Sequence, residues 1–426
     1  MLIVFIVFLI LLFMGLPVAF AVGISGVTYF LQHTEIPMLQ IAQLALSQIQ
    51  SVNLLAVPLF IFAGNLMNLC GITDRLLGLA AIVTRHMYGG MAQTSVVMST
   101  LMGGVSGSST ADAAMEARVL GPTMIKSGYS RGYTAVVIGY TSLITSTIPP
   151  GVNLIVYGTT GSVSVGRLFT AGLMSGLYMM VALMLTVHFT SKKRGYRPPN
   201  PTKATFKEIM REIKSSFWAL LFPVILLVGI RLGVFTASEV GSFACVYAMV
   251  VGIFIYRQVS VKDFIKCLRT SISDVGGIMF MISLTGVFGY GIPVEKLPQK
   301  VTAMLLSMTS SSTLILIMIV ALLFLLGMLM DGGVIVLLLT PILLPVAKAI
   351  GLDPVFFGIV MCTVCCLGIL TPPVGVAMYI VCGTLKVSMP TWIKESIPFL
   401  ITIVILLLIF ILFPGLITFL PDLVYG

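Results

Sequence analysis

Apolar residues fill most of the chain, and polar residues interrupt them in a recurring pattern. Two long apolar stretches, Met91 to Ile125 and Thr313 to Ala349, are each broken near the middle by a cluster of glycine and polar residues. A helical segment with a consecutive proline pair follows each stretch, at Pro149-Pro150 and at Pro372-Pro373. Because glycine permits tight turns and proline interrupts a helix, this pattern predicts two helical hairpins, each followed by a broken helix.

The two patterns are copies of one design. Residues 60–190 and 283–413 share features at a constant spacing of 223 residues. The matching positions are Gly104/Gly327, Pro122/Pro345, Gly128/Gly351, Pro149/Pro372, Pro150/Pro373 and Phe169/Trp392. An internal duplication in an apolar chain is typical of secondary transporters, whose binding site forms where the repeats meet.

The composition excludes a soluble domain. Hydrophobic residues make up 58% of the chain and charged residues 9%, and the mean hydropathy is +1.12, as expected for a polytopic, all-α membrane protein. Leu2 to Met14 lacks the flanks of a signal peptide and is interpreted as a retained membrane segment. Gly15 and Pro17 interrupt Leu2 to Leu31, which therefore forms either one broken span or two short passes.

The net charge of +10 indicates an orientation in the membrane rather than nucleic-acid binding, because the basic residues are sparse and flank apolar spans. The first copy ends with Lys192, Lys193, Arg194 and Arg197, whereas the second ends with Asp422 alone. Following the predicted spans along the chain places 18 of the 24 Lys and Arg residues on the cytoplasmic side. Arg118 lies within the membrane. The five on the outer side are Arg167, Arg231, Lys296, Lys300 and Lys348. The two repeats are therefore predicted to be inverted, with a periplasmic C-terminus.

Residues 1–190 are predicted to form the first inverted repeat, 191–216 a cytoplasmic linker and 217–426 the second repeat. Residues 1–70 and 217–293 are assigned to a scaffold, and 89–165 and 309–385 to the hairpins and broken helices. Apolar residues recur at helical spacing in Thr34 to Gln50 and in Arg257 to Thr270. Each of these segments fits a helix lying along the membrane interface or an ordinary loop.

The interrupted segments supply the chemistry of a binding site. Gly103 to Thr110 and Gly327 to Gly333 leave backbone groups unpaired, which hydrocarbon cannot satisfy, so such backbone requires a polar cavity, a ligand or an ion. Freed carbonyls and hydroxyls suit a desolvated cation, and the N-termini of half-helices suit a carboxylate. A glycine and serine run is also typical of a surface for close helix packing.

Three acids within apolar segments need an explanation, because charge is costly in hydrocarbon. These are Asp112, Glu116 and Asp331. Asp112 and Glu116 are one helical turn apart, and Arg118 is a candidate to neutralise one of them. For Asp112, Glu116 and Arg118 we favour a structural network over direct contact with substrate. The cluster Cys362, Cys365 and Cys366 is interpreted as helix-packing residues, with a redox or metal site as the alternative.

At these residues the chain resembles the large membrane subunit of the tripartite ATP-independent periplasmic (TRAP) transporters, over nearly its whole length. The resembling stretches are Ser106 to Ser109, Ile148 to Gly158, Gly327 to Asp331, Thr340 to Pro345, Gly351 to Pro354 and Thr371 to Gly375. The resemblance implies sodium-driven import of an organic acid across the bacterial inner membrane by an elevator mechanism, with transport and scaffold domains. It also implies a small four-helix membrane subunit, expected here as a separate polypeptide, and a periplasmic substrate-binding protein.

The resemblance also implies site residues. A first sodium ion would contact Ser106, Ser108, Ser109, Thr110, Thr145, Ile148, Gly151 and Asn153. A second would contact Gly327, Met330, Asp331, Gly333, Thr371, Val374 and Val376. Substrate would contact Ser108, Ser109, Asn153, Asp331, Gly332 and Gly375. Many family members have Asn where this chain has Val364 and His where it has Phe356, which leaves the identity of the substrate open. Within the family the sequence looks closest to sialic-acid-type systems, and C4-dicarboxylates are the alternative.

Other classes of function fit the sequence less well. A stand-alone sodium/dicarboxylate symporter of similar architecture would need neither partner and remains the alternative. An ion channel is disfavoured because no filter motif or ring of charges is visible. The three histidines, His33, His86 and His188, lie far in sequence from both hairpin tips, and no catalytic residues, enzymatic activity or cofactor beyond sodium as the coupling ion is expected.

Overall fold

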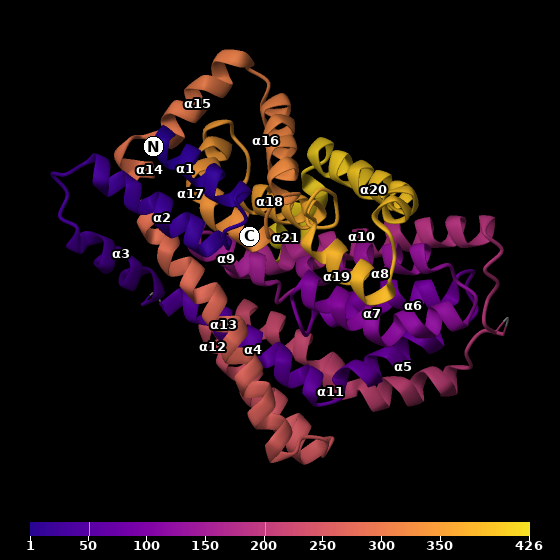
Figure 1. Ribbon diagram of the computed structural model, residues 1–426. Helices are drawn as coiled ribbons and strands as arrows, with labels where there is room; N and C mark the ends of the chain where they lie inside the picture. Colours follow the sequence, from indigo (N-terminus) through magenta and orange to yellow (C-terminus); the bar gives the residue numbers. More distant parts are fainter. Residues whose placement is uncertain (51, 201) are drawn as a thin grey trace.

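The computed structural model describes residues 1–50, 52–200 and 202–426, and this part of the chain is built of helices without β-strands (Figure 1). Six of the described helices are long and apolar enough to cross a membrane, or up to nine if each bent pair of helices forms one span. The prediction of an all-α polytopic membrane protein is confirmed.

The helix boundaries reproduce the duplication. Helix α7 (Ser109–Lys126) and helix α17 (Gly332–Ala349) each contain 18 residues and are separated by the predicted spacing. Five further pairs of helices begin within two residues of that spacing. They are α5 (Ile72–Thr84) and α15 (Leu297–Met308), α6 (Gly90–Gly103) and α16 (Ser312–Gly327), α8 (Arg131–Thr147) and α18 (Pro354–Gly368), α9 (Val152–Gly161) and α19 (Val376–Leu385), and α10 (Val165–Lys193) and α20 (Met389–Leu412).

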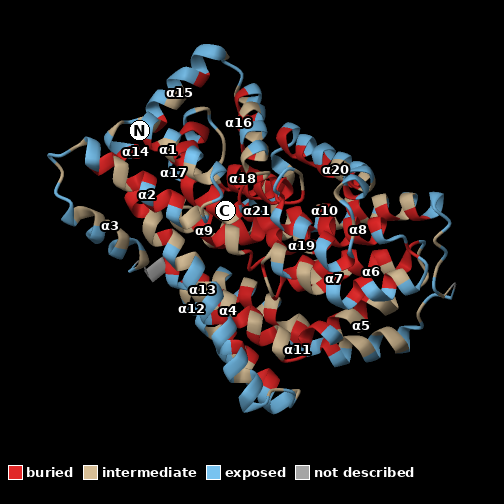
Figure 2. Cartoon of the chain, viewed as in Figure 1, coloured by how far each residue is buried: buried red, intermediate tan, exposed pale blue. Residues whose placement is uncertain are grey.

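Two equivalent helices form the centre of the molecule. Every residue of α8 from Gly132 to Thr147 is buried, and so is every residue of α18 from Val355 to Gly368. Figure 2 shows this buried centre, with more exposed helices such as α11 (Phe206–Arg231), α13 (Val261–Gly289) and α15 around it. Helices buried on all sides need small or apolar residues all round, which both sequences supply.

Both predicted hairpins and both broken helices are present. Helices α6 and α7 are joined at a short turn, Gly104 to Ser108, and α16 and α17 are joined at Met328 to Asp331. Helices α8 and α9 are bent by 40° at the first proline pair, and residues 369–375 separate α18 from α19 at the second. The Pro149-Pro150 and Pro372-Pro373 peptide bonds are both cis.

The N-terminal segment forms two short helices, α1 (Leu2–Phe13) and α2 (Val18–Gln32), that pack against each other. At 1.5 Å per residue neither is long enough to cross roughly 30 Å of hydrocarbon alone. Helix α2 packs along α13, where Gly26 allows close approach, because a β-carbon there would lie 2.7 Å from the Phe288 backbone nitrogen. The Met1 ammonium pairs with the Glu295 carboxylate.

A long helix, α13, crosses the molecule and packs against α2, α3 (Leu39–Ile49) and α4 (Ala56–Leu69) (Figure 1). Of the two alternatives for Arg257 to Thr270, the ordinary loop is wrong from Val261 onward, because these residues form the first part of α13. The equivalent segment of the first repeat does contain a separate helix, α3 (Leu39–Ile49). The other elements here are η1 (Val52–Leu55), α4 (Ala56–Leu69), α12 (Ala237–Val250), the π-helix η2 (Val251–Ile255) and α14 (Gly291–Val294).

The predicted linker, residues 191–216, begins in the last turn of α10 and ends within α11. Helix α10 continues to Lys193, and α11 (Phe206–Arg231) begins with a capping box formed by Thr205 and Glu208. The described residues 194–200 and 202–205 lie outside helices. Arg85 pairs with Glu208 over 2.9 Å and so fixes the start of α11 against the end of α5. The chain ends with α21 (Gly415–Tyr425), which packs on α10.

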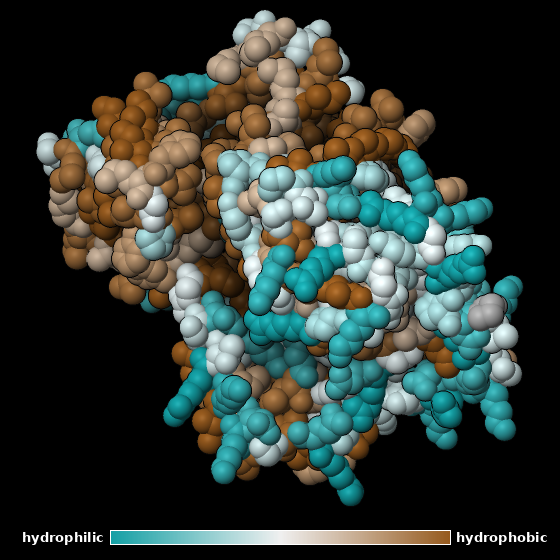
Figure 3. Space-filling view, turned by 45° about the vertical axis from the view of Figure 1, so that its right-hand side comes forward, coloured by the Kyte–Doolittle hydropathy of each residue, from teal (hydrophilic) through white to brown (hydrophobic). Residues whose placement is uncertain are grey.

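The surface is divided between hydrophobic and hydrophilic areas. Figure 3 shows hydrophobic atoms over the left and upper parts of the view and hydrophilic side chains gathered at the right and lower centre. Large apolar side chains are exposed on several outer helices, for example Leu2 (75%), Leu325 (58%) and Ile401 (52%). Such a surface fits contact with lipid rather than with water.

Candidate functional site

A cavity of about 510 Å³ lies where the two hairpin tips meet. Its walls come from the first tip and α7, from α9, from the second tip and α17, and from α4 and α13. Of the predicted site residues, Ser106, Ser108, Ser109, Thr110, Asn153, Asp331, Gly332 and Gly333 line this cavity. The structure therefore brings together residues that are more than 200 positions apart in the sequence.

The first tip is held by a backbone hydrogen bond to the broken helix. The Val152 amide donates to the Gly107 carbonyl over 3.2 Å. Gly107 has a φ of +61°, and a β-carbon there would lie 2.2 Å from the Pro150 carbonyl oxygen, so only glycine fits this position. Helix α7 starts directly after it, with Ser108 as its N-cap.

The hydroxyl groups of this tip are available to a ligand. Ser106 Oγ is buried without a hydrogen-bond partner among the described residues, and Ser106 lines the cavity. Ser108 Oγ lies 3.2 Å from Thr110 Oγ1, within hydrogen-bonding distance. Burying a hydroxyl group without a hydrogen-bond partner costs free energy, and a bound cation would give its oxygen a new interaction. The donor set of this tip therefore fits a hard cation.

Three predicted ligands of the first ion do not line the cavity. Thr145 Oγ1 lies 2.9 Å from the Ser99 carbonyl oxygen and 2.6 Å from Asp112 Oδ2, behind the tip. Ile148 packs against Gly103 and Gly176, where built β-carbons would lie 2.6 and 2.3 Å from its side chain. Gly151, the third, is the N-cap of α9.

The second tip mirrors the first. The amides of Val374 and Gly375 donate to the Met328 carbonyl over 3.1 and 3.2 Å. Asp331 is the N-cap of α17 and accepts a hydrogen bond from the Gly333 amide over 2.9 Å. Gly327 and Gly368 touch backbone to backbone, since a β-carbon on Gly368 would lie 2.4 Å from the Gly327 α-carbon.

Asn153 lies between the two tips. A β-carbon built on Gly333 would be 3.1 Å from Asn153 Oδ1, and one built on Gly332 would be 3.4 Å from Asn153 Nδ2. Asn153 Nδ2 also donates to Cys366 Sγ over 3.2 Å. The amide side chain thus connects the broken helix of the first repeat with the hairpin and the broken helix of the second.

The remaining residues predicted for the second ion and for substrate lie away from this cavity. Gly327, Met330, Thr371, Val374, Val376 and Gly375 do not line it. Val374 and Val376 are 41% and 38% exposed. The structure therefore gathers most of the first predicted site and the start of α17 in one cavity, and it leaves the second group outside the lining of this cavity.

Asp112 and Glu116 belong to a buried network of hydroxyl groups. Ser99 Oγ lies 2.9 Å from Asp112 Oδ2 and 2.9 Å from Glu116 Oε1, and Ser95 also donates to Glu116. The suggestion that Arg118 neutralises one of these acids is wrong, because Arg118 is exposed and forms no ion pair with the described residues. Both acids lie outside the cavity lining, so the geometry favours the structural network.

The far wall of the cavity was not recognised from the sequence. Asn65 on α4 donates to Ser271 Oγ over 3.0 Å and to Asp274 Oδ2 over 3.1 Å, both on α13. Asn65, Asn68 and Asp274 all line the cavity. The sequence does show polar residues within apolar helices at Asn65, Asn68 and Asp274. A single sequence does not indicate that residues of α4 and α13, about 200 positions apart, are in contact.

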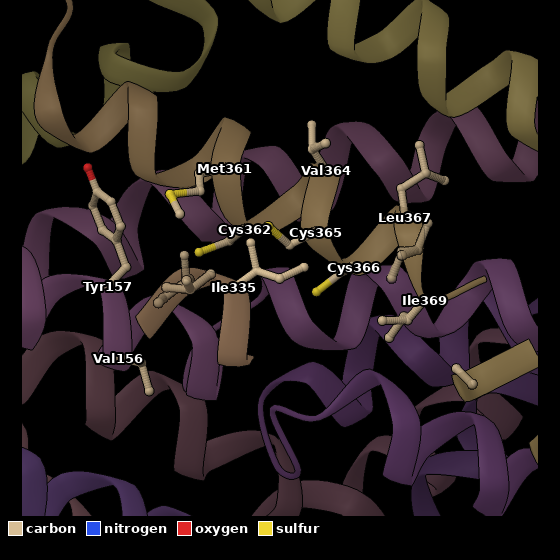
Figure 4. Packing of buried hydrophobic residues seen from close by; sticks show 14 of the residues in the cluster. Val156, Tyr157, Ile335, Met361, Cys362, Val364, Cys365, Cys366, Leu367 and Ile369 are labelled. Carbon is tan, nitrogen blue, oxygen red and sulfur yellow. The ribbon is translucent and has the colours of Figure 1, made fainter. Parts of the chain in front are cut away.

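The cysteine cluster packs inside the protein. Figure 4 shows Cys362, Cys365 and Cys366 along α18, beside Tyr157 and Ile335. All three are buried free thiols. Within the described residues no group of three or more His, Cys, Asp or Glu side chains is placed to hold a metal. This packing environment fits the interpretation of these cysteines as small helix-packing residues.

Comparison with known proteins identifies the family. Residues 5–416 match the family model described as "Tripartite ATP-independent periplasmic transporter, DctM component". The sialic acid TRAP transporter large permease protein of Vibrio cholerae is 33% identical, covering 98% of this chain and 97% of that protein. The C4-dicarboxylate TRAP transporter large permease protein of the same species is 29% identical, covering 98% and 96%. The chain belongs to the family of TRAP transporter large permeases.

A solved structure shows the same fold. The YdaH transporter of Alcanivorax borkumensis superposes with a TM-score of 0.61 at 15% sequence identity, covering 88% of each chain. At this identity the likeness concerns the fold alone. The resemblance to TRAP large subunits inferred from the sequence is confirmed by the family match.

Proposed function

We propose that this chain forms the membrane pathway of a sodium-driven importer of an organic acid, either sialic acid or a C4-dicarboxylate. One observation carries the proposal: the N-termini of α7, α9 and α17 converge on the cavity between the tips. Helix N-termini carry positive partial charge and unpaired amides, which favour a carboxylate. Interrupted backbone and hydroxyl oxygens at the same place favour a desolvated cation, as in other transporters built from broken helices.

The proposed first sodium ion binds at the tip of the first hairpin, and the buried hydroxyl of Ser106 supports this placement. The proposed second ion binds around Gly327, Met330 and Asp331 with the backbone of the second broken helix. Substrate is proposed to lie between Ser108, Asn153 and Asp331, next to the amides that start α17. Sodium then supplies positive charge that the cavity's own side chains lack.

The proposed mechanism is of the elevator kind. Residues 89–165 and 309–385 would carry the site across the membrane against the scaffold segments 1–70 and 217–293. The cavity supports this division, because α4 and α13 form one wall while the hairpins and α9 form the other. The distribution of basic residues supports inverted repeats in the inner membrane with a periplasmic C-terminus.

The family membership supports two partners, a small four-helix membrane subunit and a periplasmic binding protein that delivers the acid. The small subunit is proposed to extend the scaffold. Exposed apolar side chains on the outer faces of α1, α11 and α13, for example Phe13, Val224 and Ile272, give surfaces that either lipid or this subunit can cover.

Uptake by proteoliposomes tests the proposal. Vesicles with this chain and its small subunit should accumulate labelled acid when an inward sodium gradient and the binding protein are both present. Replacing external sodium with potassium should abolish accumulation at equal ionic strength. Equal uptake in potassium would refute sodium coupling, and equal uptake without the binding protein or small subunit would favour a stand-alone symporter.

A further inference from the structure

The cavity has a distinctive charge pattern. Among its described lining residues the ionisable side chains are two carboxylates, Asp274 on α13 and Asp331 at the second tip, without any Lys, Arg or His. The positive charge for an anionic substrate must therefore come from helix N-termini and from bound sodium. These sources lie at the hairpins and α9, whereas Asp274 lies on the part of the wall formed by α4 and α13, which we assign to the rest of the substrate.

The wall formed by α4 and α13 is fixed in its orientation. The side-chain amide nitrogen of Asn65, Nδ2, donates hydrogen bonds to Ser271 and Asp274, which holds the Asp274 carboxylate in place. Asn65 Oδ1 is left as an acceptor. Asn68 Oδ1 accepts a hydrogen bond from Thr73 over 2.9 Å, so the side-chain amide NH2 group of Asn68 remains as a donor. The wall presents a carboxylate, a carbonyl and an amide N–H.

This wall lies close to the first hairpin tip. A β-carbon on Gly64, next to Asn65, would lie 3.3 Å from the Val105 carbonyl oxygen and 3.4 Å from the Ser106 α-carbon. A substrate whose carboxylate is held among Ser108, Asn153 and the start of α17 therefore has its other end within reach of the wall in a cavity of about 510 Å³.

The two candidate substrate classes differ at that end. A second carboxylate can only accept hydrogen bonds, and it would be placed against the Asp274 carboxylate, which also only accepts. A hydroxyl group can donate to Asp274 and accept from Asn68 at the same time. Juxtaposed like charges in a confined cavity disfavour binding, whereas a paired donor and acceptor favour it.

We infer that Asp274, oriented by Asn65, determines specificity and selects hydroxylated monocarboxylates such as sugar acids over dicarboxylates. This inference rests on the proposed function and specifies its substrate class. Asp274 would contact the end of the substrate that is away from the carboxylate bound at the helix N-termini. It is not one of the residues proposed for the two ion sites.

Equilibrium binding to the purified complex of this chain with its small subunit tests the inference. The probes are sialic acid and gluconate as hydroxylated monocarboxylates, and succinate and fumarate as dicarboxylates, each in sodium and in potassium. The hydroxylated acids should bind in sodium at least about tenfold more tightly than the dicarboxylates, because a site built for hydroxyl groups discriminates strongly against ligands that lack them.

Two variants separate specificity from stability. Asp274→Asn keeps a partner for Asn65 but removes the charge, and it should reduce the preference for hydroxylated acids about tenfold, with succinate bound more tightly than by the parent. Glu35→Gln neutralises an exposed acid outside the cavity and should leave the preference unchanged. Thermal unfolding of both variants should match the parent.

The outcomes are distinguishable. Tighter binding of dicarboxylates by the parent, or an unchanged preference in Asp274→Asn, would overturn the inference while leaving sodium-coupled transport intact. Absence of sodium-dependent binding of every probe, together with absence of sodium-dependent uptake in vesicles, would refute the proposed function and the inference with it.

Discussion

The backbone amide of Val152 donates to the carbonyl of Gly107 over 3.2 Å, so the first residue of α9 is bonded to the tip of the first hairpin. Gly375 and Met328 make the same kind of bond in the second repeat, also over 3.2 Å. In both repeats a hairpin and its broken helix therefore form one unit. A change at either tip is transmitted directly to the helix N-termini that face the cavity.

Gly107→Ala should disable transport. The added β-carbon would lie 2.2 Å from the Pro150 carbonyl oxygen, and φ is +61°, so the tip must shift. We expect uptake to fall at least about tenfold and stability to fall by about 1–3 kcal/mol. Gly128→Ala is the matched control, because φ there is +91° but nothing lies within 4 Å of the added carbon. If both variants transport alike, the close contact at the tip is unimportant.

Removing the oxygen atoms of the tips should weaken sodium coupling. The double variant Ser108→Ala with Ser109→Ala, and separately Asp331→Ala, should lower sodium-dependent uptake about tenfold and raise the sodium concentration for half-maximal uptake. Folding and association with the small subunit should be retained. Ser307→Ala, whose hydroxyl only bonds the Met304 carbonyl at the end of α15, serves as the control. Parental sodium dependence in the tip variants would contradict the ion assignments.

Ser99→Ala should destabilise the protein. Its hydroxyl lies 2.9 Å from both Asp112 Oδ2 and Glu116 Oε1 and can donate to one of them, so its loss leaves this buried pair of acids short of a hydrogen bond. The expected cost is about 1–3 kcal/mol, measured as a lowered unfolding temperature in detergent. Thr100→Val on the same helix removes a hydroxyl that bonds only the Val96 carbonyl and should cost less. Equal effects would show that the network contributes nothing specific.

Arg118→Gln should leave stability within about 0.5 kcal/mol of the parent, as is usual for exposed positions without a structural partner. Arg118 is exposed, and the nearby acids are held by hydroxyl groups instead. The measurement is again the unfolding temperature. A loss as large as that of Ser99→Ala would revive the pairing between Arg118 and one of the acids.

The hairpins and broken helices were predictable because their causes are local. Glycine at the tips and paired prolines in α8–α9 and α18–α19 act on the backbone within a few residues. The wrong pairing of Arg118 with Asp112 or Glu116 could also have been avoided from local sequence. Asp112 and Glu116 share a helix face, but Arg118 follows Glu116 by two residues and so points to another side. Helical periodicity alone contained that information.

Other features could not be read from one sequence. Amphipathic spacing in Arg257 to Thr270 indicates a helix but not its end, and no proline follows before Gly289, so α13 continues without a break. The contact between Asn65 and Asp274 joins residues 209 positions apart. Such a pair depends on how α4 packs on α13, which the order of residues along either helix does not specify.

The most direct test is an experimental structure of the complex with its small subunit, determined in sodium with bound acid. We expect density for the carboxylate among Ser108, Asn153 and the start of α17, with a cation at the first tip beside Ser106. Density for the acid elsewhere, with this cavity holding water alone in every conformation observed, would contradict this expectation.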